Sequence, residues 1–205
     1  MTTARWIDDQ LLRRGISDER VLAAMERVPR EQFLPDQLRD FAYEDAALPL
    51  EHGQTVSQPF IVAFICEGLA LAGDERVLDV GTGSGYQAAV LAELAADIHS
   101  IERVAGLAEN ARRALESAGY ERVHVHVGDG TLGLPELAPF GGIAVAAATA
   151  ELPAALWNQL EEGRRIVLPL GRRRAQRLCV LERAGDDARL VSSVPARFVP
   201  LVAGR

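Results

Sequence analysis

The chain has 205 residues, of which 48% are hydrophobic and 25% charged, a length and composition that suit one globular domain with a sizeable core. Its formal net charge of −7 argues against a nucleic-acid partner held by phosphate neutralisation, and no lysine is present for Schiff-base chemistry. No apolar run reaches the roughly 18 residues of a membrane helix and the N-terminus does not resemble a secretory signal, so we expect a cytoplasmic protein without a membrane partner.

The first 40 residues are predicted to be helical, because apolar residues from Leu11 to Val28 recur at helical spacing. Asp18 is a suitable N-cap within this region. Residues 41–57 follow no regular period. Residues 58–71 again carry apolar side chains along one helical face, so a further helix is expected there.

From about residue 74 onward, short apolar strands alternate with helices. Strands are predicted at residues 76–80, 97–101, 122–127, 143–148, 164–170, 178–182 and 190–198. Helices are predicted at residues 86–95, 104–118 and 152–160. This alternation predicts an α/β fold, a Rossmann-like seven-stranded sheet with helices on both faces and a small helical N-terminal extension. The two closing β segments have no helix between them, which is typical of a sheet whose last strand is antiparallel.

A glycine-rich turn after the first of these strands is the strongest motif. It consists of Gly81, Thr82, Gly83, Ser84 and Gly85. Asp79 precedes it, and Glu102 closes the next strand, 21 residues after Gly81. Ligands of such folds bind at the carboxyl edge of the sheet, and an acidic residue at this spacing suits the two hydroxyls of a ribose. A purely structural turn is the alternative.

A second glycine motif, Gly128-Asp129-Gly130, ends the third of these strands. Its carboxylate suits the amino group of an adenine, although an ordinary Asp–Gly turn has the same composition. The first turn has the form GxGxG, whereas dinucleotide-binding turns have GxGxxG to lead a pyrophosphate onto a helix N-terminus. The motifs therefore favour S-adenosylmethionine as the cofactor, with NAD as the second choice.

Nearly the whole chain resembles the protein-L-isoaspartate O-methyltransferase family. The matching stretches are residues 28–31, 42–45, 53–59, 81–91, 100–103, 119–120, 128–130, 135–140 and 198–201. The glycine turn indicates only a methyltransferase in general. The combination of residues 53–59 with residues 198–201 is much more specific to this family.

The resemblance implies a methyltransferase that esterifies the free α-carboxylate of isoaspartyl residues in damaged proteins, which starts their repair. Isoaspartyl-containing proteins and peptides are then the partners, and a monomer is expected. Ser57 matches the family's active-site serine, Gln54 and Thr55 line the same pocket, and Val199 lies in the strand that contacts the substrate. Residues 1–57 are expected to form the helical extension and substrate-pocket loop, and residues 58–205 the cofactor domain.

A carboxylate acceptor is already ionised at neutral pH, so the reaction needs no general base. Ser57 is therefore predicted to position the carboxylate through a hydrogen bond and not to act as a nucleophile. Its alternative role is an N-cap for the helix that starts near Gln58. His124 and His126 alternate on a strand and are interpreted as structural. The two cysteines lack the spacing of metal ligands, and the sequence predicts no metal site.

The chain departs from the family pattern at Gly141 and Ala146, where the family usually has Asp and Thr. Both are expected at the lip of the strand predicted at residues 143–148, close to the transferred methyl group. Two alternatives to the leading hypothesis follow. The same domain could methylate another acceptor, or it could be a cofactor-binding relative with weakened catalysis that acts through protein contacts.

Overall fold

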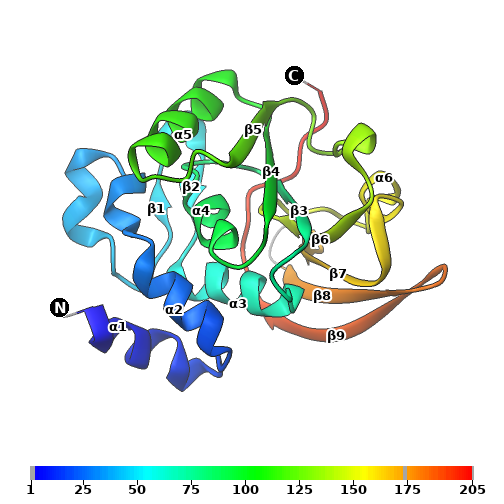
Figure 1. The fold of residues 1–205 in the computed structure, drawn as a ribbon, viewed down its shortest axis with the longest axis horizontal. Coiled ribbons are helices and arrows are strands. Elements are labelled where there is room, and N and C mark those ends of the chain that lie inside the picture. Colours follow the sequence, from blue (N-terminus) through cyan, green and yellow to red (C-terminus); the bar gives the residue numbers. More distant parts are fainter. Residues whose placement is uncertain (1–2, 173–174, 205) are drawn as a thin grey trace.

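The computed structural model describes residues 3–172 and 175–204, and a seven-stranded sheet of order β5-β4-β3-β6-β7-β8-β9 runs through it (Figure 1). The strands are β3 (Arg76–Val80), β4 (Asp97–Glu102), β5 (Val123–Val127), β6 (Phe140–Val145), β7 (Leu160–Leu170), β8 (Arg177–Ala184) and β9 (Asp187–Pro195). Strands β3 to β7 are parallel. The predicted Rossmann-like sheet is confirmed.

The closing strands have the expected antiparallel pairing. Strand β8 runs antiparallel to β7, and β9 runs antiparallel to β8, so the chain reverses direction twice at this edge. At the centre, β3 lies between β4 and β6, and successive strands are added outward on both sides. The carboxyl ends of β3, β4 and β6 therefore meet where the strand order reverses, which is where open α/β sheets bind ligands.

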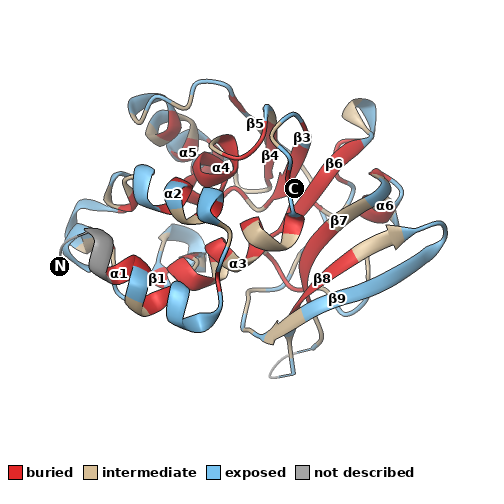
Figure 2. Cartoon of the chain, turned by 60° about the horizontal axis from the view of Figure 1, so that its bottom comes forward, coloured by how far each residue is buried: buried red, intermediate tan, exposed pale blue. Residues whose placement is uncertain are grey.

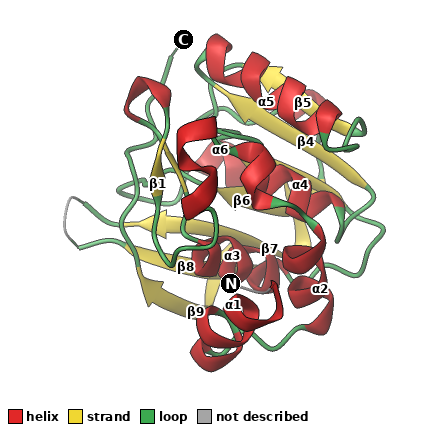
Figure 3. Cartoon of the chain, turned by 90° about the vertical axis from the view of Figure 1, so that its left-hand side faces the viewer, coloured by secondary structure: helices red, strands yellow, loops and turns green. Residues whose placement is uncertain are grey.

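Six α-helices surround the sheet in the described part of the chain (Figure 3). They are α1 (Thr3–Gln10), α2 (Glu19–Arg27), α3 (Pro59–Leu69), α4 (Tyr86–Ala92), α5 (Ala105–Ser117) and α6 (Ala154–Trp157). Helices α3 and α4 share a buried core with Val77 and Val167 on one face of the sheet, and α6 packs against Leu78 and Ile166 on the other. Because strand side chains alternate between the two faces, these layers bury the central strands β3 and β6 on both sides.

The N-terminal region is helical as predicted, but it is divided. Gly15 has a left-handed backbone (φ 95°) after the turn η1 (Leu12–Arg14), and two further 3-10 turns, η2 (Arg30–Phe33) and η3 (Asp36–Phe41), begin directly after prolines. The predicted cap is confirmed, since the Asp18 carboxylate accepts the backbone N–H groups of the first turn of α2. The Arg20 side chain donates to the carbonyl oxygens of Leu71 and Leu94, which ties α2 to the segments that follow α3 and α4.

Some predicted boundaries were wrong. Strand β6 occupies residues 140–145 instead of 143–148, because Gly141 and Gly142 are extended strand residues and not a turn before it. Helix α6 has only four residues, since the next strand already starts at Leu160. The irregular segment contains a small hairpin of β1 (Leu48–Pro49) and β2 (Thr55–Val56) around the turn η4 (Glu51–Gly53).

Burial is greatest along the central strands and least at the β9 edge (Figure 2). Strand β6 is buried at all six positions, whereas β9 is exposed over its first six residues. The cysteines Cys66 and Cys179 are buried and free. Among the described residues, no helix combines the length and apolar character that crossing a membrane requires.

Candidate active site

A cleft of about 540 Å³ opens at the carboxyl edge of the sheet. Its floor is formed by the ends of β3, β4 and β6 and the residues after them. One wall is residues 53–58, which include β2 and lead into α3, and the other is the C-terminal segment 195–202. The cleft therefore joins three parts of the chain that are far apart in sequence, at the edge where the sequence predicted a ligand.

The predicted site residues divide into two groups. Those that line the cleft are Gln54, Thr55, Ser57, Gly81, Thr82, Gly83, Ser84, Glu102, Gly130 and Val199. Those that do not line it are Asp79, Gly85, Gly128 and Asp129. Within the second group, Asp79 and Asp129 accept hydrogen bonds from neighbouring segments of the chain.

The glycine turn adopts a backbone that L side chains rarely reach. The φ angles of Gly81, Gly83 and Gly85 are 97°, 54° and 90°. Glycine carries no Cβ penalty at positive φ, and it leaves the peptide groups open to a ligand. The Gly81 N–H donates to the carbonyl of Ile101 at 2.9 Å, so the turn is also fastened to the end of β4.

Asp79 is fully buried beneath this turn and has no exposure to the cleft. Its carboxylate accepts hydrogen bonds from Gln87 Nε2 and Ser100 Oγ, each at 2.7 Å. Ser100 Oγ lies 2.6 Å from Thr82 Oγ1, so the network reaches the turn itself. Burial raises the pKa of the Asp79 carboxyl to about 6, against the pull of these hydrogen bonds. Asp79 thus holds the glycine turn in place from below.

Glu102 faces the cleft from the end of β4. Its Oε2 accepts the N–H of Gly83 at 3.0 Å, and its Oε1 accepts the N–H of Val104 at 2.9 Å. Each carboxylate oxygen can accept more than one hydrogen bond, so both retain capacity for hydroxyl donors of a ligand. The two backbone bonds fix the carboxylate in one orientation, as the binding of a ribose diol requires.

Asp129 lies outside the cleft and closes a local turn. Its Oδ1 accepts Thr131 N at 2.8 Å and Thr131 Oγ1 at 2.6 Å, and its Oδ2 accepts Gly204 N at 2.6 Å. The hydrogen bonds, led by that of the Thr131 hydroxyl, hold the pKa of the Asp129 carboxyl below its usual range. In this structure Asp129 therefore anchors the C-terminal segment, while the neighbouring Gly130 lines the cleft.

Ser57 lies on the wall formed by residues 53–58. Helix α3 begins at Pro59 with Gln58 as its N-cap and no side-chain cap bond, so the alternative role of Ser57 as an N-cap was wrong. The reason is local: Pro59 at the first helical position lacks an N–H, and the Gln58 side chain is held by Asp45. No hydrogen bond among the described residues occupies the Ser57 hydroxyl, which leaves it available to a ligand.

Val199 is fixed on the opposite wall by backbone pairing. Its carbonyl accepts the N–H of Ala148 at 2.8 Å, and the Ala148 carbonyl accepts the N–H of Leu201 at 2.8 Å. The side chain of Gln176 adds bonds to both the N–H and the carbonyl of Phe198. Residues 198–201 therefore continue past the edge of the sheet as an ordered strip over the cleft.

Sequence reasoning missed three arginines that line the cleft, namely Arg14, Arg103 and Arg197. The Arg14 guanidinium lies 3.6 Å from the centre of the Phe60 ring and pairs with Asp45 at 3.1 Å. Arg14 comes from the N-terminal extension, and no local pattern could associate it with the cleft. Arg103 directly follows Glu102, so its place beside the cofactor turn could have been inferred.

The expected position of Gly141 was wrong. Gly141 lies near the start of β6, at the end of the strand remote from the cleft, and a Cβ there would be 2.7 Å from Glu75 Cγ. The Glu75 side chain occupies that space and accepts Arg164 Nη1 at 2.9 Å. Ala146, in contrast, lines the cleft as expected, and its N–H donates to the carbonyl of Val80.

A Rossmann-like sheet with an antiparallel ending, a GxGxG turn and an acidic residue closing the next strand defines a methyltransferase domain. The chain belongs to the protein-L-isoaspartate(D-aspartate) O-methyltransferase family, whose family model matches residues 4–205. It is 55% identical to protein-L-isoaspartate O-methyltransferase 2 of Marinobacter nauticus over 195 residues, covering 94% of this chain and 89% of the relative. It is 50% identical to the Roseiflexus sp. protein-L-isoaspartate O-methyltransferase over 196 residues, with coverage of 96% and 90%.

Solved structures show the same fold. One protein-L-isoaspartate O-methyltransferase superposes with a TM-score of 0.82 at 28% identity, covering 99% of this chain and 66% of that one. A second, from Plasmodium falciparum and in complex with S-adenosyl-L-homocysteine, superposes with a TM-score of 0.82 at 24% identity, with coverage of 98% and 97%. The predicted family and fold are thereby confirmed.

Proposed function

We propose that this protein transfers the methyl group of S-adenosylmethionine to the free α-carboxylate of L-isoaspartyl residues in damaged proteins. The observation that carries the proposal is a single cleft that joins the glycine turn and Glu102 to the wall bearing Ser57. Membership of the protein-L-isoaspartate O-methyltransferase family supports the same reaction. Isoaspartyl-containing proteins and peptides are then its partners, and we place it in the cytoplasm as a monomer.

The cleft fits this cofactor in three respects. Its volume of about 540 Å³ is in the range of pockets that enclose a small-molecule ligand. Glu102 offers oriented acceptors for the ribose hydroxyls. Gln87 lines the cleft, and its buried Oε1 has no hydrogen-bond partner among the described residues, so a movement of this side chain would offer an acceptor to the ammonium group of the cofactor's methionine part. When bound, the cofactor supplies an electrophilic methyl group on a sulfonium.

The residues of the cleft need only to orient the acceptor and exclude water. The carboxylate of the substrate is ionised at neutral pH and is itself the nucleophile, so no side chain has to remove a proton. The Ser57 hydroxyl can donate a hydrogen bond that aims one carboxylate oxygen at the methyl group. Holding reactants in line at contact distance lowers the entropic part of the barrier.

Incubation with methyl-labelled S-adenosylmethionine and an isoaspartyl peptide tests the function directly. The matched control is the peptide of the same sequence with a normal aspartyl linkage. We expect a base-labile label on the isoaspartyl peptide and none on its twin. Equal labelling of the two peptides would show a less selective carboxyl methyltransferase, and labelling of neither would refute the proposal.

A further inference from the structure

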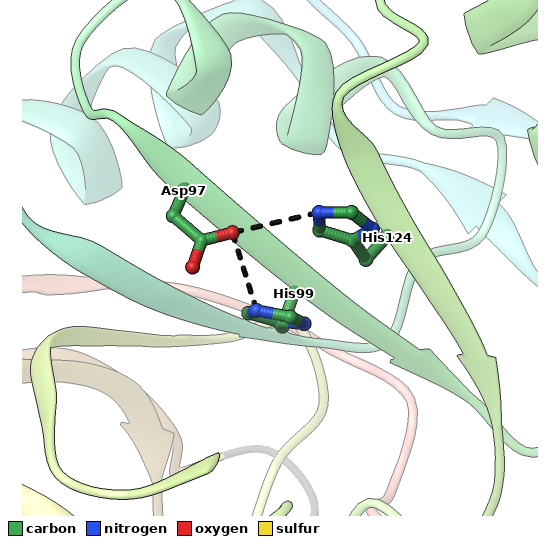
Figure 4. A group of neighbouring side chains, drawn as sticks. All are labelled: Asp97, His99 and His124. Atoms are coloured by element: carbon green, nitrogen blue, oxygen red, sulfur yellow. Dashed lines mark ion pairs between the residues drawn. The ribbon is translucent and has the colours of Figure 1, made fainter.

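A cluster of Asp97, His99 and His124 lies on strands β4 and β5 (Figure 4). His99 and His124 are direct partners in the parallel pairing of the two strands. Asp97 precedes His99 by two positions and so shares its face of the sheet. Val123 and Val125 pack into the core on the side of α5, which sends the His124 side chain to the opposite face.

The potential ligand atoms are close enough to share one ion. Asp97 Oδ1 lies 3.2 Å from His99 Nε2 and 3.6 Å from His124 Nε2, and all three ligand atoms lie within 4.8 Å of one another. A tetrahedral Zn²⁺ with bonds of about 2.0–2.1 Å separates its ligand atoms by about 3.3 Å. Small side-chain rotations therefore suffice to bring these three atoms around a zinc ion.

Neighbouring groups already orient two of the ligands. Arg76 Nε donates to the other oxygen of Asp97 at 2.8 Å, so Oδ1 faces the histidines. The far nitrogen of His99, Nδ1, lies 3.0 Å from His126 Nε2. Hydrogen bonds of this kind fix the tautomer and ring orientation of metal-binding histidines. The centres of the stacked His99 and His124 rings are 4.8 Å apart, and the Nε2 atoms of both rings lie near Asp97 Oδ1.

The cluster is accessible and independent of the cofactor cleft. The side chains of Asp97, His99 and His124 are 31%, 10% and 55% exposed, so one ligand is anchored in the protein while another is open to solvent. Asp97 begins β4, whereas Glu102 ends it, so the cluster and the cleft lie at opposite ends of the same strand. An ion here would cross-link β4 to the edge strand β5.

We propose that Asp97, His99 and His124 form a binding site for one Zn²⁺ ion that stabilises the β5 edge of the sheet. Two imidazoles and a carboxylate are a donor set suited to zinc, with the fourth position open to water. The site has no part in methyl transfer. In the alternative interpretation of this cluster, Asp97 forms ion pairs with Arg76 and the histidines, and no metal binds.

Calorimetric titration of the metal-free, tag-free full chain with ZnCl₂ tests the site. We expect one equivalent to bind, with at least about a tenfold loss of affinity in His124→Ala and in Asp97→Asn. The matched control is His52→Asn, because His52 is the one histidine outside this region and asparagine tolerates its positive φ of 56°. The control should bind zinc as the unaltered chain does.

Thermal melting distinguishes the site from accidental surface binding. Zinc should raise the melting temperature of the unaltered chain and of His52→Asn, but not that of His124→Ala or Asp97→Asn. The affinity for S-adenosyl-L-homocysteine should be the same with and without zinc. The proposal is overturned by absence of zinc binding, by binding that persists in both ligand variants, or by zinc that competes with S-adenosyl-L-homocysteine.

Discussion

Three carboxylates lie at or just after the carboxyl ends of β3, β4 and β5, and each has a different environment. Asp79 is enclosed beneath the glycine turn, Glu102 faces the ligand space with both oxygens oriented, and Asp129 holds the C-terminal segment. Their residue type is nearly identical, so the surroundings alone determine their roles. The same holds for Ser57, whose hydroxyl is left free because Gln58 and Pro59 form the start of α3.

Replacement of Ser57 by alanine is expected to lower turnover on an isoaspartyl peptide by at least about tenfold, because a hydrogen bond to a charged group is lost. The affinity for S-adenosyl-L-homocysteine, measured by calorimetry, should stay nearly unchanged. Ser117→Ala at the exposed end of α5 is the control and should alter neither quantity. A parallel loss of turnover and cofactor affinity would assign Ser57 to folding and not to the substrate.

The raised pKa of Asp79 predicts a particular dependence of stability on pH. Burial raises this pKa from 3.8 to about 6, so the folded state keeps the proton more tightly than the unfolded state. The contribution of Asp79 to the free energy of unfolding is therefore fully present below about pH 4 and decreases as the pH rises through about 6. The decrease amounts to about 3 kcal/mol at most.

Urea denaturation of Asp79→Asn between pH 4 and pH 7 tests this dependence. The variant should lose stability less steeply than the unaltered chain over this interval, because asparagine does not ionise. The comparison is the difference between the two curves, so other titrating groups cancel. If the stability of the two proteins changes equally with pH, the ionisation of Asp79 does not contribute to the pH dependence.

At the scale of elements, strand β6 shows how a neighbouring side chain limits which residue type fits at one position. The buried Glu75 side chain fills the space beside Gly141, where a Cβ would be 2.7 Å from Glu75 Cγ and 2.8 Å from Glu75 Cβ. A glycine in a strand is normally unfavourable, but here it makes room for the Glu75–Arg164 ion pair. Glycine replaces the family's usual Asp at this position, and the space beside it is filled by Glu75. The replacement lies away from the cleft.

Gly141→Ala is expected to destabilise the protein by about 1–3 kcal/mol through overpacking against Glu75. Cofactor affinity should be unaffected, because the substitution lies at the far end of β6. The matched control is Gly106→Ala in α5, where an added Cβ would have only a contact of 3.8 Å to His52 and alanine favours the helix. Denaturant melts and calorimetry give both quantities. Unchanged stability would mean that Glu75 moves aside without penalty.

At the scale of the whole molecule, the cleft connects the N-terminal extension, the sheet and the C-terminal segment. A ligand that contacts all three should stabilise them together. S-adenosyl-L-homocysteine at 100 times its Kd adds about 2.7 kcal/mol to the free energy of unfolding, provided that it binds only the folded state. For a chain of 205 residues this corresponds to about 5–10 °C in melting temperature.

At that same ligand concentration, Glu102→Ala should show a much smaller shift, because loss of the ribose contact weakens binding by about 1.5–3 kcal/mol. Glu116→Ala, an exposed position on α5, is the control and should keep the full shift. Differential scanning calorimetry of each protein with and without the ligand measures the effect. A full shift in Glu102→Ala would show that its carboxylate does not hold the ligand.

The sequence alone determined the order of strands and helices, the glycine turn and the acidic residue closing β4. These features are encoded locally, by the period of apolar residues and by glycines at positions of positive φ. Two glycines inside β6 concealed its start, because their effect depends on Glu75 and Leu71 packing against them.

Only the tertiary structure decided which side chains face the cleft. Asp79 and Glu102 have the same chemistry and similar motif positions, but burial and partners separate them. Contacts between distant segments bring Arg14 and Val199 to one cleft. Such contacts also bring Asp97 together with two histidines at the opposite end of β4. Such contacts follow from packing of the entire chain, which short-range sequence patterns do not encode.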